Sequence, residues 1–122
     1  MAARRTPPNL PRLECRFYRS TSGSEPVRDW LKGLSPDVRQ EIGSDIQVVQ
    51  WRWPVGPPLV DGLGAGLYEV RTKVNTNIYR ALFCVRGSVM VLLHGFQKKA
   101  QRTPKRDIDL GRQRQRDVEE ER

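Results

Sequence analysis

The sequence predicts an α+β fold in which an N-terminal strand and a two-helix hairpin pack on one face of an antiparallel sheet. Apolar residues recur at helical spacing in residues 27–34 and again in 38–53, and they predict the hairpin. Three alternating segments joined by short turns follow at 67–73, 78–86 and 88–96, and they predict a meander. Helices segregated to one face of an antiparallel sheet define this fold class.

Composition narrows the function classes. The 122 residues suffice for about one domain, and 22 Lys and Arg against 14 Asp and Glu give a net charge of +8. So basic a chain favours a polyanion such as RNA as its partner. No apolar run approaches the roughly 20 residues of a membrane span, and residues 1–12 lack the apolar core of a secretory signal. We therefore expect a cytoplasmic protein with no membrane partner.

Cofactor chemistry has little support in the composition. Two cysteines and one histidine supply neither a Cys/His zinc site nor a disulfide framework. No metal and no small-molecule cofactor is therefore expected. The glycine-rich segment 62–66 precedes a strand and not a helix, so it is expected to be a plain turn and not a phosphate-binding loop.

The chain divides into a short tail and one domain. Residues 1–12 are basic and rich in proline and are expected to form a flexible tail, and residues 13–122 a single domain. Ser24 is the expected N-cap of the first helix. A last helix over 104–122, opened by Thr103-Pro104, is expected to be marginal. Its apolar stripe is poor, and Gly111 inside it costs about 1 kcal/mol relative to alanine.

Alternation along the meander places cations on one face of the sheet. The face expected to be open carries Leu67, Glu69 and Arg71; Arg80 and Leu82; and Leu92, His94, Phe96 and Lys98. The face expected to pack on the hairpin carries Tyr68 and Val70; Tyr79, Ala81 and Phe83; and Val91, Leu93 and Gly95. We therefore expect Arg71, Arg80, His94 and Lys98 to line up across an exposed surface.

Such a face suits phosphate, because arginine offers bidentate contacts and lysine a point charge. Metal-independent RNA cleavage requires a base for the 2′-hydroxyl, cations for the charge on the pentavalent phosphate, and an acid for the 5′-oxygen. His94, Tyr79 or a lysine with a lowered pKa could exchange these protons.

Four sequence blocks occur in a characteristic order and spacing within residues 14–110. They are Gly66-Leu67-Tyr68-Glu69-Val70-Arg71; Tyr79-Arg80 with Phe83; Leu92-Leu93-His94-Gly95-Phe96-Gln97-Lys98-Lys99; and Thr103-Pro104 with Asp107-Ile108. In these blocks the chain resembles the RelE/HigB-type toxins of bacterial type II toxin–antitoxin systems, in particular the phage-derived HigB-like branch of the RelE/ParE superfamily. The resemblance implies an mRNA endoribonuclease that acts in the ribosomal A site, inhibits translation and is neutralised by a cognate antitoxin.

The resemblance also implies roles for single residues. Arg71, Arg80 and Lys98 are implied to bind phosphate and stabilise the transition state, and His94 and Tyr79 to transfer protons. The remaining cations are expected to contact RNA electrostatically: Lys73, Lys99, Arg102, Lys105 and Arg106.

Other interpretations stay open. The lack of a convincing general base favours a non-catalytic basic RNA- or ribosome-binding module. Gyrase-directed toxins share this superfamily's fold, so the fold alone does not fix the target. Arg71 and Arg80 could instead be structural partners of Glu69 or of a neighbour, and His94 a hydrogen-bonded structural residue.

Overall fold

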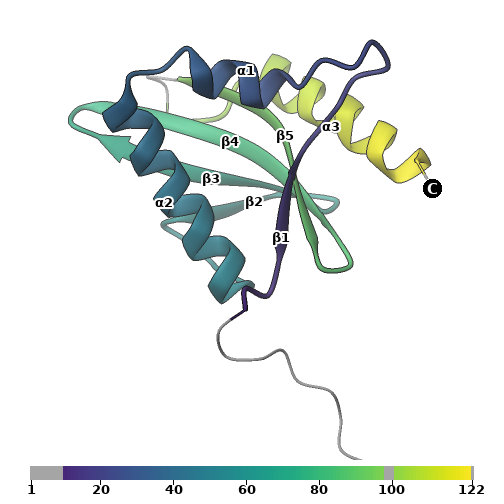
Figure 1. The fold of residues 1–122 in the computed structure, drawn as a ribbon, viewed down its shortest axis with the longest axis horizontal. Helices are drawn as coiled ribbons and strands as arrows, with labels where there is room; N and C mark the ends of the chain where they lie inside the picture. The colour runs from purple at the N-terminus through teal and green to yellow at the C-terminus, as the bar shows by residue number, and fades with distance from the viewer. Residues whose placement is uncertain (1–9, 98–100, 122) are drawn as a thin grey trace, which may run out of the picture.

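The computed structural model describes residues 10–97 and 101–121, which form five strands and three helices (Figure 1). The strands are β1 (Glu14–Phe17), β2 (Val60–Gly64), β3 (Leu67–Val74), β4 (Asn77–Arg86) and β5 (Val89–Gln97). The helices are α1 (Pro26–Lys32), α2 (Pro36–Arg52) and α3 (Lys105–Glu120). The predicted α+β class is confirmed. Within these residues no helix is long and apolar enough to cross a bilayer.

All five strands belong to one sheet in the order β1-β5-β4-β3-β2. Neighbouring strands from β2 to β5 are antiparallel, as the short turns of the meander predict. The first strand, β1, pairs with β5 in the parallel sense. One parallel pair is thus added to the predicted antiparallel sheet.

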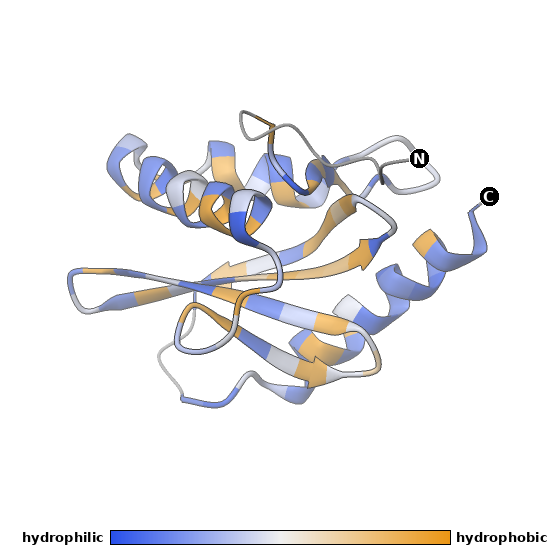
Figure 2. Cartoon of the chain, turned by 90° about the horizontal axis from the view of Figure 1, so that it is seen from below, coloured by the Kyte–Doolittle hydropathy of each residue, from blue (hydrophilic) through white to orange (hydrophobic). Residues whose placement is uncertain are grey.

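The sheet lies between two helical layers (Figure 2). Helices α1 and α2 cover one face, where Ile42, Ile46, Phe83 and other apolar residues form the larger core. Helix α3 packs against the other face, over Leu67 and Leu82. The expectation of an open sheet surface opposite the hairpin is therefore wrong. The two leucines on that face need a cover, and α3 provides it.

Local signals account for the start of α2 but not of α1. Ser35 caps α2, with its Oγ atom 3.5 Å from the backbone nitrogen of Val38, and Pro36 follows it. The prediction that Ser24 caps α1 is wrong. This helix begins after Glu25, which makes no side-chain capping bond, and the Ser24 hydroxyl instead lies 2.7 Å from that of Ser20.

The glycine-rich segment contains a strand that the sequence does not predict. Residues Val60–Gly64 pair with β3, and only Ala65 and Gly66 form the turn. Both turn residues have positive φ, 52° and 78°, which is typical of the tight hairpin turn that favours glycine. The expectation of a plain turn over the whole segment is therefore wrong, because glycine weakens the strand pattern without preventing pairing.

A β-bulge in β5 changes the predicted faces of that strand. Leu82 pairs with His94 and Phe83 with Leu92, so Leu93 is the extra residue. As a result Leu92 joins the core under α1 and α2, whereas Leu93 lies under α3 with His94 and Phe96. The prediction that Leu92 shares the face of His94 is wrong, and so is the placement of Val91 and Leu93 against the hairpin.

Glycine in the middle of α3 permits a close approach to the sheet. Gly111 is buried, and a Cβ atom at this position would come within 2.8 Å of Leu82 Cδ1. Polar contacts fix the helix further along: Arg112 donates to the carbonyl oxygens of Leu63 and Gly64 at 2.7 and 3.0 Å. The predicted last helix is therefore present, and its glycine has a packing reason.

The expected N-terminal tail lies mostly outside the described residues. Its last member, Arg12, donates a side-chain hydrogen bond to the carbonyl oxygen of Trp53 at 3.0 Å. Its backbone nitrogen donates to the carbonyl oxygen of Gln50 at 2.8 Å. The domain therefore begins to make contacts with α2 at this residue.

Candidate functional site

Cross-strand pairing brings the predicted residues of three strands onto the face that α3 partly covers. One row of neighbours runs from β2 to β5 through Asp61, Glu69, Leu82 and His94, and the next row contains Arg71, Arg80 and Phe96. Adjacent strands are about 4.8 Å apart, so the backbone of His94 lies about 10 Å from that of Glu69. The predicted grouping of Arg71, Arg80 and His94 on one face is thus confirmed.

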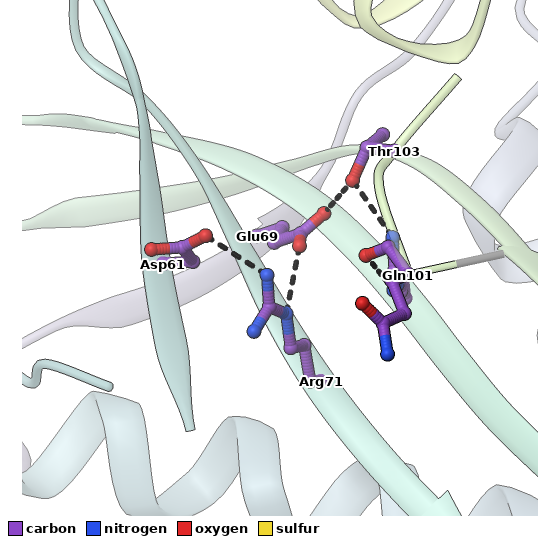
Figure 3. A network of polar contacts seen from close by, with 6 residues as sticks. Asp61, Glu69, Arg71, Gln101 and Thr103 are labelled. Carbon is purple, nitrogen blue, oxygen red and sulfur yellow. Dashed lines mark hydrogen bonds and ion pairs between the residues drawn. The ribbon is translucent and has the colours of Figure 1, made fainter. Parts of the chain in front are cut away.

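Arg71 is held between two carboxylates. Its Nε atom donates to Glu69 Oε2 at 2.9 Å, and its Nη2 atom donates to Asp61 Oδ2 at 2.8 Å (Figure 3). Its side chain is 35% exposed, against 0% for that of Glu69. The guanidinium therefore reaches the surface with its charge balanced and its orientation fixed on one side.

Glu69 connects Arg71 to the segment that leads into α3. Its second oxygen, Oε1, accepts a hydrogen bond from the Thr103 hydroxyl, which in turn accepts one from Arg80 Nη1 at 3.0 Å. Figure 3 shows this chain of polar contacts from Asp61 to the Thr103 segment. Thr103 was expected only to open the last helix. It makes no capping bond and instead bonds to the sheet.

Arg80 is buried and binds the same segment. It is 2% exposed, and its Nη2 atom donates to the carbonyl oxygen of Gln101 at 2.7 Å. These contacts hold residues 101–103 against β4. Arg80 is therefore part of the framework of the site and not an open surface cation, contrary to the exposed position expected for it.

His94 forms an acid–imidazole pair with the first turn of α3. Its Nε2 atom lies 2.7 Å from Asp107 Oδ1, and both side chains are largely buried. The ring also stacks on Phe96, with 5.2 Å between centroids and 21° between planes. An ionised Asp107 favours the tautomer that carries the proton on Nε2, which leaves the Nδ1 lone pair as a base.

The other predicted residues divide into three groups. Tyr79 is buried in the core under α1 and α2, on the opposite face from His94, so the structure does not bring the two together. Lys98 and Lys99 lie outside the described residues. The remaining candidates are all exposed: Lys73 on β3, Arg102 before α3, and Lys105 and Arg106 in its first turn.

A pocket of about 230 Å³ opens beside Arg71. Arg71, Asp61 and Glu69 line it from the sheet, and Thr103 and Arg102 line it from the segment before α3. Leu63, Gln101 and Ile108 complete its wall. The pocket therefore joins the buried polar network to the exposed cations.

Residues 29–116 match the model of the family described as phage derived protein Gp49-like (DUF891). This segment is most of the chain and includes every described residue of the network. The chain belongs to the Gp49-like family. The family is associated with RelE-like toxins of toxin–antitoxin systems. None of the curated proteins matches this chain.

Sequence reasoning missed three contributors to the site of this Gp49-like chain. Asp61 lies on the strand that the glycine-rich pattern concealed. Asp107 and Thr103 belong to the last of the four blocks that carry the resemblance, but Thr103 was expected only to open the last helix and Asp107 had no expected role. The signal that could have suggested the pairing of His94 with Asp107 is their separation of only 13 positions in the sequence.

Asp109 favours the charged form of Lys105 at the start of α3. A hydrogen bond from Lys105 to Asp109, 2.8 Å long, raises the pKa of the lysine, and the negative charge of Asp109 acts in the same direction.

Among the residues that the structure describes, no cluster of three or more His, Cys, Asp and Glu side chains is arranged to hold a metal ion.

Proposed function

We propose that this Gp49-like chain is the toxin of a type II toxin–antitoxin system and acts as a metal-independent, ribosome-dependent mRNA endoribonuclease of the HigB type. The observation that carries the proposal is the His94–Asp107 pair on the same sheet face as Arg71. Its support from outside the site is membership of a family associated with RelE-like toxins, together with a net charge of +8.

The proposed chemistry uses these residues in complementary roles. Nδ1 of His94 takes the proton of the ribose 2′-hydroxyl, whose oxygen attacks the adjacent phosphorus while the bond to the 5′-oxygen breaks. The products are a 2′,3′-cyclic phosphate and a 5′-hydroxyl that receives a proton. Lys98 is proposed to stabilise the negative charge on the phosphate. Arg71, whose charge is balanced by Asp61 and Glu69, is proposed to contact the RNA beside it. Asp107 and Arg80 are positioning residues, because they contact His94 and the Thr103 segment.

The exposed cations are proposed to bind the RNA backbone around this centre. Three of them lie in or just before the first turn of α3: Arg102, Lys105 and Arg106. Lys73 lies on β3, two residues after Arg71. Contacts of this kind are electrostatic and independent of sequence. A cognate antitoxin with an acidic surface or segment is proposed to cover these cations and so mask the site.

A second function, a non-catalytic RNA- or ribosome-binding module, is favoured by one observation. Arg80 is buried and Arg71 is neutralised by two carboxylates, which leaves fewer cations for a developing charge than the exposed face that was expected. Such a module would retain RNA binding through its surface cations and would not cleave.

The test is cleavage by the purified full chain of one mRNA in two states, free and under translation. Accumulation of fragments with 2′,3′-cyclic ends in the translated sample alone supports the proposal. Equal cleavage of free RNA overturns its ribosome dependence. RNA binding without fragments in either state favours the binding module, and inhibition of DNA supercoiling in a parallel assay would move the target to gyrase. His94→Gln is the matched variant for the chemical step.

A further inference from the structure

The pocket beside Arg71 has a balance of charge that does not suit a phosphate group. Its lining includes the cations Arg71 and Arg102 and the carboxylates Asp61 and Glu69, so the charges cancel. Two carboxylates next to a phosphate would repel it, and here they already neutralise the guanidinium that faces the pocket. A neutral polar group is therefore the better occupant of this pocket.

Among the charged residues that line the pocket from the sheet, hydrogen-bonding capacity remains on Asp61 and Arg71. Both oxygens of Glu69 are occupied, one by Arg71 and one by Thr103, and its side chain is fully buried. The Asp61 side chain is 39% exposed and, among the described residues, accepts a hydrogen bond through Oδ2 only. Oδ1 of Asp61 and the outer nitrogen of Arg71 are thus an acceptor and a donor at the mouth of the pocket.

Size and walls narrow the class of ligand. A volume of about 230 Å³ is below the roughly 300–1,000 Å³ of pockets for drug-sized ligands, so a single ring system is the unit that fits. Leu63 and Ile108 are half-buried and add apolar surface to the lining. Single-stranded RNA is commonly recognised through splayed bases that pack on side chains and present their Watson–Crick edge.

We propose that this pocket binds a guanine base of the RNA, an inference that rests on the proposed function. Guanine alone among the four bases offers two adjacent N–H donors, N1 and N2, beside an acceptor, O6. A carboxylate can accept from the two donors, here through Oδ1 and the remaining lone pair of Oδ2, and a guanidinium can donate to the acceptor; Asp61 and Arg71 present these two groups. Asp61 is the specificity-determining residue in this proposal, and it takes no part in the chemical step.

The experiment measures binding of the four nucleoside 5′-monophosphates to the purified full chain by NMR titration. The expected result is that GMP binds about 5-fold or more tightly than AMP, CMP or UMP, the lower end of what one bidentate base contact contributes. In Asp61→Asn the preference for GMP should disappear while the weak binding of AMP persists. The matched control is Asp45→Asn on α2, in the opposite helical layer, where the same change of charge should leave the preference intact.

Two outcomes overturn the proposal. One is equal affinity for the four nucleotides in the wild-type chain. The other is a GMP preference that survives in Asp61→Asn or is lost equally in Asp45→Asn. Because the titration needs no cleavage, a chain that prefers GMP but cuts no RNA would contradict the proposed function and leave the base pocket standing.

Discussion

Asp107, in the first turn of α3, holds His94 on β5 through a contact of 2.7 Å between Oδ1 and Nε2. This pair joins the sheet to the helix that covers it, beside the hydrogen bonds of Arg112 and Arg114 to strand carbonyl oxygens. It also fixes the orientation of the ring, one face of which stacks on Phe96. Because Asp107 occupies Nε2, the nitrogen left for the proposed base is Nδ1 of His94, and under the proposed function a change in either residue should lower RNA cleavage.

Replacement of the proposed base should lower the rate of the chemical step without abolishing RNA binding. His94→Gln should slow single-turnover cleavage by about 10²–10⁴-fold, the usual contribution of a general base. Asp107→Asn should also slow it, because an amide no longer selects the productive tautomer. The measurement is single-turnover cleavage against pH, with RNA affinity measured in parallel. Asp109→Asn, two residues further along α3 and exposed, is the control; an equal loss in that variant would contradict the assignment.

Thr103 should contribute to stability through its hydroxyl. Thr103→Val leaves a buried Glu69 oxygen and Arg80 Nη1 without this partner, and a buried unsatisfied polar group costs about 1–3 kcal/mol. Thr103→Ser keeps the hydroxyl and should retain most of the stability. Urea unfolding of the two variants checks this. Equal stability of the valine and wild-type chains would show that the hydroxyl contributes little.

Gly95 should not tolerate a side chain. A Cβ atom at this position would lie 2.1 Å from the Trp30 ring, so the indole or the strand must move. Overpacking of this kind costs about 1–3 kcal/mol, and Gly95→Ala should lower the free energy of unfolding by a similar amount. Gly56→Ala, where a Cβ atom meets nothing within 4 Å, is the matched control and should change stability little. A Gly95→Ala chain as stable as the control would contradict the packing.

Stability should fall as the pH rises from 9 to 11. Burial raises the pKa of Cys15 and of Cys84 from 9.0 to about 11. Between these values the unfolded chain loses its thiol protons and the folded chain keeps them, so unfolding releases protons and is favoured by alkali. Burial and the hydrogen bond to Asp117 raise the pKa of Tyr18, which extends the trend above pH 10. Urea titrations across this window should show a shallower slope in Cys84→Ala; an unchanged slope would contradict the contribution of that thiol.

Surface cations at the start of α3 should act on affinity and not on the chemical step. Lys105→Ala and Arg106→Ala should each weaken RNA binding for all sequences and reduce the slope of log affinity against log salt by about 0.7, the value for single strands. Fluorescence anisotropy at several salt concentrations measures this slope. A loss of affinity confined to one RNA sequence would instead indicate a base contact.

Periodicity predicted the faces of β3 and β4 correctly and failed in β5. In β3 and β4 the side chains alternate without interruption, so Glu69 and Arg80 lie on the predicted side. The bulge at Leu93 shifts the alternation in β5 by one residue, and no local signal in an apolar run such as Val89–Leu93 marks where it occurs. His94 and Phe96 keep their predicted face only because they follow the bulge.

The candidate site was predictable in its strand residues, including the pairing of Arg71 with Glu69, and not in Asp61 or Asp107. Arg71 and His94 belong to regular strands, so their shared face follows from alternation. The bond between Thr103 and Glu69 joins residues 34 positions apart, and only the packing of α3 on the sheet brings them together. The segment before α3 also covers Arg80, which is buried. This burial could not be predicted, because a polar helix such as α3 gives little indication in sequence of the surface that it covers.

The most direct measurement of the central claim is mapping of mRNA 5′ ends in a bacterial host minutes after induction of this chain alone, beside an identical culture that expresses His94→Gln. The account predicts new 5′ ends inside translated reading frames for the wild-type chain and their near absence for the variant. Intact mRNA in the wild-type culture, whether growth stops or continues, would contradict the assignment of endoribonuclease activity.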